Sequence, residues 1–218
     1  MTPSTDGLRE RKKRQTRQRI HQAATELFVA RGFDEVTIAE VAEAAEVSVN
    51  TLYNYIEAKE DLVLPRDQEF AQRLADFVME RAPGESAARA VLGRLRDEVH
   101  RRDPSLGLTE GFARVYAMMR AAPTLTARLE QLGQRMTAAL AVVLAEETGA
   151  APDAPLPRVV ATQLGSLHAL VYSEIGRLIS AGQHPDAIAE AVLALLDAAE
   201  EILGEPILTY ATRDTREE

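Results

Sequence analysis

Side chains that can hydrogen-bond to nucleic acid are concentrated in one short stretch, AEVSVNTLYNYIEAKEDL, from Ala45 to Leu62. Two tyrosines, two asparagines and a lysine lie there within ten residues of one another. Hydroxyls and amides can bind phosphate oxygens or base edges, and an asparagine presented in the major groove pairs bidentately with adenine. The stretch therefore has the chemistry that DNA recognition needs.

Charge is distributed unevenly along the chain. The net charge of −9 by itself argues against a nucleic-acid partner. Residues 9–19, however, carry seven positive charges against one negative, whereas residues 61–218 carry 16 basic and 24 acidic side chains. All three lysines, Lys12, Lys13 and Lys59, lie in the first 60 residues. We infer a basic arm on an acidic body, and a solvated helical tail is the alternative.

Composition narrows the class of protein. A length of 218 residues with 46% hydrophobic content allows one large domain or two small ones with a buried core. The absence of cysteine excludes disulfides, cysteine-based zinc sites and thiol nucleophiles. No apolar signal region follows the basic N-terminus, and no run of about 18 apolar residues occurs. We expect a cytoplasmic protein without a membrane segment, and we expect no metal or other cofactor.

The elements that must position the polar stretch are helices. Strand patterns are nearly absent, and Ala, Leu, Glu, Arg and Gln dominate, so we expect an all-α fold. Glycine and proline divide the chain into helix-sized segments. The expected helices cover residues 9–30, 38–44, 49–55, a long helix from 59 that is kinked at Pro65, 85–102, 108–121, 124–148, 157–181 and 185–203.

Three helices at the start of the chain have helix-turn-helix spacing. Thr37 and Glu40 form a capping box that opens the helix at 38–44, and Ser48 is the N-cap candidate for the helix at 49–55. A short helix, a four-residue turn and a second short helix place the second helix in the major groove. The side chains spaced to pack inward are Ile38, Val41, Ala42, Val47, Leu52 and Ile56. Those left facing outward are Val49, Asn50, Thr51, Tyr53, Asn54 and Tyr55.

Lys59 is the next polar residue of the stretch. Together with the backbone N–H groups at the start of the following helix, it predicts a second anion site, aimed at a phosphate rather than a base. The alternative for Tyr53 and Tyr55 is that they are half-buried aromatics that bridge helices.

Through Arg19 to Leu62 the chain resembles the TetR family of bacterial transcriptional regulators. The resemblance rests on ARGF followed by the pattern TI..VA..A.VS..TLY.Y...K..L. It implies that Val49, Asn50 and Asn54 lie near bases and that the basic arm lies over the minor groove or phosphates. It also implies contacts to the DNA backbone from Thr37, Thr51, Tyr53, Tyr55 and Lys59. The residues expected to bind DNA are Arg11, Lys12, Lys13, Arg14, Arg17, Thr37, Ser48, Val49, Asn50, Thr51, Tyr53, Asn54, Tyr55 and Lys59.

The chain departs from the family pattern at three positions. Glu46 stands where the family usually has glycine in the turn, and a non-glycine residue with positive φ is strained. Val49 replaces a lysine, arginine or polar residue, which suits contact with a thymine methyl group. Ile56 replaces a frequent phenylalanine and keeps the apolar role.

The rest of the chain follows the family's general plan. We expect a disordered N-terminus at 1–8, a three-helix DNA-binding head at 9–58, a larger ligand-binding and dimerisation body at 59–205, about nine helices in all, and a tail at 206–218. Apolar stripes over 160–178 and 188–202 suit a four-helix dimer interface, although burial inside the monomer is an open alternative.

The resemblance also implies a ligand cavity in the body. Methionines and aromatic side chains line adaptable pockets, and His168 and Tyr172 share an i, i+4 spacing. The candidate lining residues, for which a core or interface role is the alternative, are Phe70, Leu74, Phe77, Phe112, Tyr116, Met119, Met136, His168 and Tyr172.

Two other functions compete with transcriptional regulation. No Gly-rich phosphate loop, serine nucleophile elbow or His-Glu-x-x-His motif occurs, and the four histidines lie on different segments, which argues against an enzyme. A helical protein-binding module without DNA function is compatible with the acidic body. We predict instead a repressor that a small, mainly apolar effector releases from a palindromic operator on double-stranded DNA, and a homodimer formed through 157–181 and 185–203.

Overall fold

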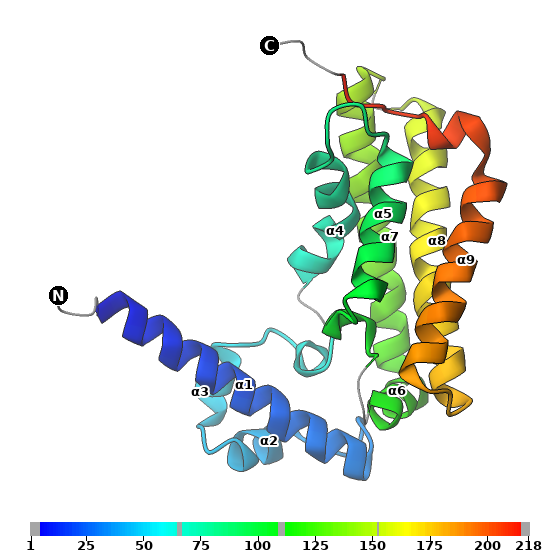
Figure 1. Ribbon diagram of the computed structural model, residues 1–218. Coiled ribbons are helices and arrows are strands. Elements are labelled where there is room, and N and C mark those ends of the chain that lie inside the picture. The colour runs from blue at the N-terminus through cyan, green and yellow to red at the C-terminus, as the bar shows by residue number, and fades with distance from the viewer. Residues whose placement is uncertain (1–4, 65–66, 109–111, 152, 215–218) are drawn as a thin grey trace. The chain divides into compact units, whose positions relative to one another are not determined.

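The structure is a computed structural model that describes residues 5–64, 67–108, 112–151 and 153–214, and within these ranges it contains helices and no strand (Figure 1). This confirms the all-α prediction. The elements in chain order are α1 Thr5–Arg31, α2 Ile38–Ala44, α3 Val49–Tyr53, the 3₁₀ turn η1 Lys59–Leu62, α4 Asp67–Met79, α5 Ala87–His100, the 3₁₀ turn η2 Pro104–Leu106, α6 Phe112–Ala121, α7 Pro123–Thr148, α8 Pro155–Ser180 and α9 Pro185–Leu208.

The described residues form two compact units. The first is drawn from Met1–Arg66 and Arg114–Leu129, and the second from Asp67–Ala113 and Glu130–Glu218. In the first unit α1 packs on α2 and η1, and α2 packs on α3. In the second unit α5 and α8 both pack on α9, and α4 packs on α5.

The two short helices of the first unit begin at side-chain caps. The Thr37 hydroxyl accepts a hydrogen bond from the Glu40 N–H (3.2 Å), and a Glu40 carboxylate oxygen accepts one from the Thr37 N–H (2.8 Å). The Ser48 hydroxyl accepts a hydrogen bond from the Thr51 N–H (3.0 Å) at the start of α3. The predicted capping box and N-cap are therefore both present, and they satisfy backbone donors that the first helical turn leaves unpaired.

The turn between α2 and α3 closes as a Schellman motif. The Val47 N–H donates to the Ala42 carbonyl (2.9 Å), and the Glu46 N–H donates to the Glu43 carbonyl (3.0 Å). Glu46 has a φ of 51°, so it occupies the left-handed conformation that glycine adopts without strain. The turn therefore keeps the geometry that a glycine favours, although its residue is a glutamate.

The long helix expected from Lys59 onward is not observed. Residues Lys59–Leu62 form a 3₁₀ turn, and α4 begins at Asp67; Pro65, the expected kink, lies outside the described residues. An Asp61 carboxylate oxygen accepts the N–H groups of Glu57 (2.8 Å) and Ala58 (2.9 Å), which tightens this turn. The Leu62 carbonyl accepts a hydrogen bond from the His21 ring nitrogen Nδ1 (3.0 Å).

The apolar stripes of α8 and α9 mostly face the interior of the second unit. Their buried members are Val160, Leu164, Leu167, Val171 and Ile175 on α8, and Ile188 and Val192 on α9. The alternative of burial within the monomer therefore holds for these residues, and a dimer formed through the two helices stays a prediction. The stripe residues Leu178, Leu195 and Ala199 are only half-buried, and 84% of Ile202 is exposed.

The last helix is interrupted at Gly204, where glycine was expected to end it. Gly204 has φ 69° and ψ 162°, and one further turn follows to Leu208. Beyond this turn the chain hydrogen-bonds to the segment between α4 and α5: the Ser86 hydroxyl donates to the Leu208 carbonyl (2.6 Å), and the Gly84 N–H donates to the Arg213 carbonyl (2.8 Å). The described part of the C-terminal segment is thus fixed to the second unit.

Replacing Glu46 by glycine is expected to stabilise the α2–α3 turn by up to about 1 kcal/mol. The left-handed conformation costs an L-residue roughly 1–2 kcal/mol, and glycine's larger unfolded-state entropy offsets part of that gain. Amide hydrogen exchange of α2 and α3 measures the change. As a matched control, Glu43→Gly places glycine inside α2 and should destabilise it by about 1 kcal/mol. Faster exchange in Glu46→Gly would contradict the strain argument.

Candidate DNA-binding surface

The outward face of α3 is made by its polar and small apolar residues. Leu52 is completely buried, whereas 53% of Tyr53 and 40% of Val49 are exposed, and Asn50 and Asn54 are exposed as well. One buried residue therefore orients four side chains to the surface. Tyr53 is exposed, so it is not the half-buried aromatic of the alternative interpretation. Tyr55 is half-buried, as that alternative expected.

The serine and threonine hydroxyls of the predicted interface are already engaged within the first unit. The Ser48 and Thr51 hydroxyls hydrogen-bond to each other (2.7 Å). The Thr37 hydroxyl donates to Glu40 (2.8 Å), and the Arg31 guanidinium also donates to Glu40 (2.7 Å). The backbone N–H of Thr37, together with the Arg31 and Thr37 side chains, lowers the pKa of Glu40 to about 2. Glu40 therefore remains a carboxylate at neutral pH and holds Thr37 in place.

Lys59 joins η1 to the end of α1. Its ammonium donates a hydrogen bond to the Phe33 carbonyl (2.5 Å) and lies 4.4 Å from the centroid of the Phe33 ring and 5.6 Å from that of Phe28. The two rings pack together with centroids 4.9 Å apart. An ammonium has three N–H groups, so the bond to Phe33 leaves donors for a phosphate. The sequence predicted a phosphate contact here but gave no sign of this internal role.

The basic residues lie on α1 itself rather than before it. Arg11, Lys12, Lys13 and Arg14 are exposed, and Arg17 is half-buried. Because they stand on a helix of 27 residues, their charges have fixed positions along its surface.

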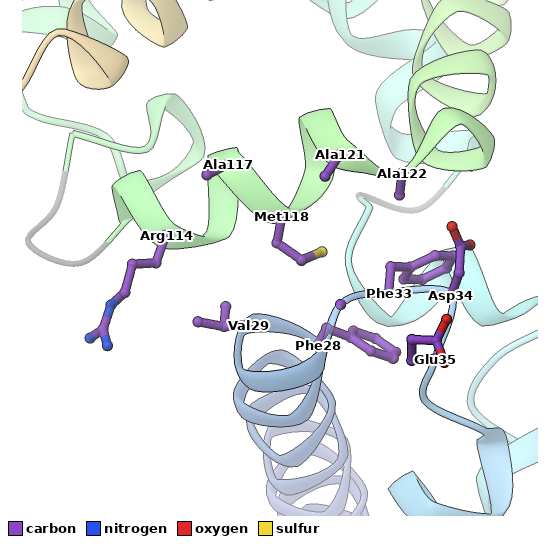
Figure 2. Close-up of a pocket in the computed structure, with 11 residues that line it drawn as sticks. Phe28, Val29, Phe33, Asp34, Glu35, Arg114, Ala117, Met118, Ala121 and Ala122 are labelled. Atoms are coloured by element: carbon purple, nitrogen blue, oxygen red, sulfur yellow. The ribbon is translucent and has the colours of Figure 1, made fainter.

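The first unit also contains a cavity of about 420 Å³. Figure 2 shows Met118 pointing from α6 toward the Phe28 and Phe33 rings, with Val29 of α1 opposite. The remaining lining residues are Gly32, Asp34, Glu35, Arg114, Ala117, Ala121 and Ala122. Sequence reasoning did not select this cavity, because its two sides come from segments about 80 residues apart and neither carries a recognisable pattern. Phe33 belongs both to this cavity and to the Lys59 contact.

The residues expected to line a ligand cavity are only partly brought together. In the second unit the His168 ring lies 5.9 Å from the Phe70 ring and 4.7 Å from the Tyr172 ring, measured between centroids. The Phe112 ring lies against Gly107, and Leu74, Phe77 and Met136 are buried. Tyr116 and Met119 belong instead to the first unit, since they lie on the part of α6 that follows Arg114.

The described residues contain neither a candidate metal site nor a candidate membrane span. No group of three or more His, Asp or Glu side chains there is placed to hold a metal ion. No helix in the described ranges combines the length and apolar character needed to cross a bilayer.

Comparison with known proteins decides the family. Residues 20–64 match the family of bacterial regulatory proteins called tetR. The chain is 31% identical over 191 residues to the HTH-type transcriptional regulator TcmR of Streptomyces glaucescens, an alignment that covers 82% of this chain and 77% of TcmR. The chain belongs to the TetR family. It is a DNA-binding transcriptional regulator, and its relatives act as regulators rather than as enzymes.

Solved structures agree on the fold. NalD, the secondary repressor of the MexAB-OprM multidrug efflux pump in Pseudomonas aeruginosa, superposes with a TM-score of 0.55 at 20% identity, covering 85% of this chain and 97% of NalD. A second crystal structure of NalD gives a TM-score of 0.51 at 19% identity, covering 86% of this chain and 96% of NalD. These similarities support a helix-turn-helix head with a helical body for this TetR-family chain.

Tyr53 and Lys59 are expected to respond differently to substitution. Tyr53→Phe removes an exposed hydroxyl and should weaken DNA binding about tenfold, the value of one hydrogen bond to a charged group, without changing the melting temperature. Lys59→Met should weaken DNA binding and also lower the melting temperature, because the Phe33 carbonyl loses its ammonium partner. Fluorescence anisotropy and thermal unfolding measure the two effects.

Tyr210→Phe is the matched control, because Tyr210 lies in the second unit and its substitution should leave DNA affinity unchanged. Unchanged DNA affinity in Tyr53→Phe would remove Tyr53 from the interface.

Proposed function

We propose that this TetR-family regulator is a cytoplasmic homodimeric repressor, released from a palindromic operator by a small, mainly apolar effector. The observation that carries the DNA-binding part is the outward face of α3, where Leu52 is buried and Val49, Asn50, Tyr53 and Asn54 are exposed. A helix in this setting presents its N-terminal side chains to the major groove. We propose repression rather than activation because NalD, which has a similar fold, is a repressor.

The proposed roles within the head follow from chemistry and exposure. Asn50 and Asn54 offer amides for base edges, and Val49 offers a methyl surface for a thymine. Tyr53 and the exposed cations of α1 contact phosphates, which fixes the register on the duplex without reading sequence. The further phosphate contacts come from Arg17, Thr37, Ser48, Thr51, Tyr55 and Lys59.

The proposed dimer uses the outer faces of α8 and α9 rather than the buried stripes. On α8, Leu156, Val159 and Leu170 are each about half exposed. On α9, Ala187, Ala194 and Ala198 are exposed, and their small side chains allow another helix to approach closely. Because these apolar and small residues recur along the exposed sides of both helices, a second copy of the same two helices is the proposed cover.

The proposed path from effector to DNA runs through α6. Met118 of α6 lines the cavity in the first unit with Phe28 and Phe33, and Phe33 holds Lys59 at the start of η1. A shift of α6 would therefore disturb the packing around Phe33. An effector changes DNA affinity only by as much as it favours one arrangement over the other.

Binding to the DNA that flanks the gene, compared with scrambled DNA over a salt series, tests the proposed function. We expect specific binding with a steep salt dependence, because each neutralised phosphate contributes about 0.9 to the slope of log affinity against log salt. Asn50→Ala combined with Tyr53→Ala should abolish the preference for the flanking DNA. Deleting the gene should raise transcription from that promoter, and a fall in transcription would show an activator instead.

Charge placed on the outer face of α8 should break the dimer. Val159→Glu buries a carboxylate in the proposed interface and should weaken self-association at least tenfold, as measured by sedimentation velocity. Val142→Glu introduces the same change at a valine of α7 with similar exposure, 56% against 50%, and should leave the dimer intact. Equal behaviour of the two variants would exclude this face of α8.

A further inference from the structure

Two buried polar atoms of the second unit lack a hydrogen-bond partner among the described residues: Arg73 Nε on α4 and His168 Nε2 on α8. Only 3% of His168 is exposed. A buried donor or acceptor without a partner costs roughly 1–3 kcal/mol, and in natural proteins nearly all such atoms are paired with a protein group, a water molecule or a ligand. Both atoms belong to one cluster: Arg73 Nη2 lies 3.4 Å from the Ser105 hydroxyl, and Ser105 also hydrogen-bonds to the side chain of Tyr172, whose ring centroid lies 4.7 Å from that of His168.

The rest of the Arg73 guanidinium is firmly held. Its Nη2 donates to a Glu98 carboxylate oxygen (2.7 Å) and to the Ser105 hydroxyl (3.4 Å), and the group lies 5.3 Å from the centroid of the Phe77 ring. Burial raises the pKa of Glu98, and Arg73 opposes that rise. Because the ion pair balances the charge of Arg73, a molecule that meets its Nε–H need not be an anion.

His168 supplies the second polar atom in aromatic surroundings. The centroid of its ring lies 5.9 Å from that of Phe70 and 4.7 Å from that of Tyr172. Burial, assisted by Arg73, lowers the pKa of His168 to about 3, so the imidazole is neutral at physiological pH. The Nε2 of a neutral imidazole donates or accepts a hydrogen bond according to its tautomer.

We propose that Arg73 and His168 are the polar anchors of the effector site, and that the effector is an uncharged aromatic molecule with a phenolic hydroxyl or a ketone oxygen. This inference rests on the proposed function, in which an effector binds the body. The oxygen of a hydroxyl group accepts a hydrogen bond from Arg73 Nε–H, and the same hydroxyl donates a hydrogen bond to His168 Nε2. A ketone oxygen accepts a hydrogen bond from both groups. A carboxylate would be repelled by Glu98, and a hydrocarbon would leave both atoms unpaired.

Three probes of the same ring system separate these cases: 2-naphthol, 2-methylnaphthalene and 2-naphthoate. We expect the full-length protein, free of DNA, to bind 2-naphthol about tenfold more tightly than 2-methylnaphthalene, because only the hydroxyl satisfies the two buried atoms. 2-Naphthoate should bind most weakly. Fluorescence titration gives the affinities, and the ¹⁵N shift of His168 Nε2 should change only with 2-naphthol.

Two substitutions assign the preference to the anchors. His168→Leu should bind 2-naphthol and 2-methylnaphthalene equally, and without ligand it should melt at a higher temperature than the parent protein, because an unpaired polar atom is replaced by an apolar group. Arg73→Lys keeps the charge opposite Glu98 but lacks the Nε–H, and it should also lose the preference. His100→Leu, at an exposed histidine of α5, should retain it.

The proposal fails if the parent protein binds 2-naphthol and 2-methylnaphthalene equally, if it binds neither up to their solubility limits, or if His168→Leu keeps the preference. An Nε2 signal that is unchanged by bound 2-naphthol, as a trapped water would produce, also overturns it. None of these outcomes bears on operator binding. Conversely, a failure of specific DNA binding would contradict the proposed repressor function. The probe affinities would still test whether Arg73 and His168 bind the ligand.

Discussion

Helix α3, which carries the proposed DNA-reading side chains, is not stable on its own, and this constraint organises the first unit. α3 has five residues, far fewer than a helix needs to be stable alone, because its first turn fixes several dihedral angles for a single hydrogen bond. Its order comes from the Ser48 cap and from Leu52, the one α3 residue that is buried. Since successive residues are rotated by about 100°, burying Leu52 fixes which side chains face outward. The outward face of α3 is thus set by the packing behind it.

Features that depend on local chemistry were predictable from the sequence. The capping box at Thr37 and Glu40 and the cap at Ser48 involve residues three positions apart, and such spacing is visible in a linear chain. The 3₁₀ turn at the start of the predicted fourth helix was not predictable in this way. The carbonyl of Leu62 in this turn accepts a hydrogen bond from His21, 41 residues away in the chain. Neighbouring side chains favoured a helix there, and a distant one satisfied the carbonyl.

Periodicity identified the buried faces of α8 and α9 but not what buries them. An apolar stripe indicates that one side of a helix is buried away from water. The interior of a monomer and a dimer interface both satisfy that condition. The alanines of α9 and the spaced apolar residues of α8 are a weaker pattern, and only the observed exposure of Val159 and Leu170 distinguishes the outer face. Arg73 and Glu98 were missed because charged residues on helices normally face solvent.

The internal contacts of Lys59 would also favour its proposed contact with a phosphate. A free lysine side chain loses about 2 kcal/mol of rotamer entropy when a phosphate fixes it. In this head the Phe33 carbonyl and two aromatic rings already fix the ammonium, so much of that loss occurs during folding rather than during binding. The same contact makes the position of the ammonium depend on Phe33, which also lines the cavity beneath α6. A displacement of Phe33 would therefore release Lys59 and return the entropy cost to the binding step, which lowers DNA affinity without any change in α3.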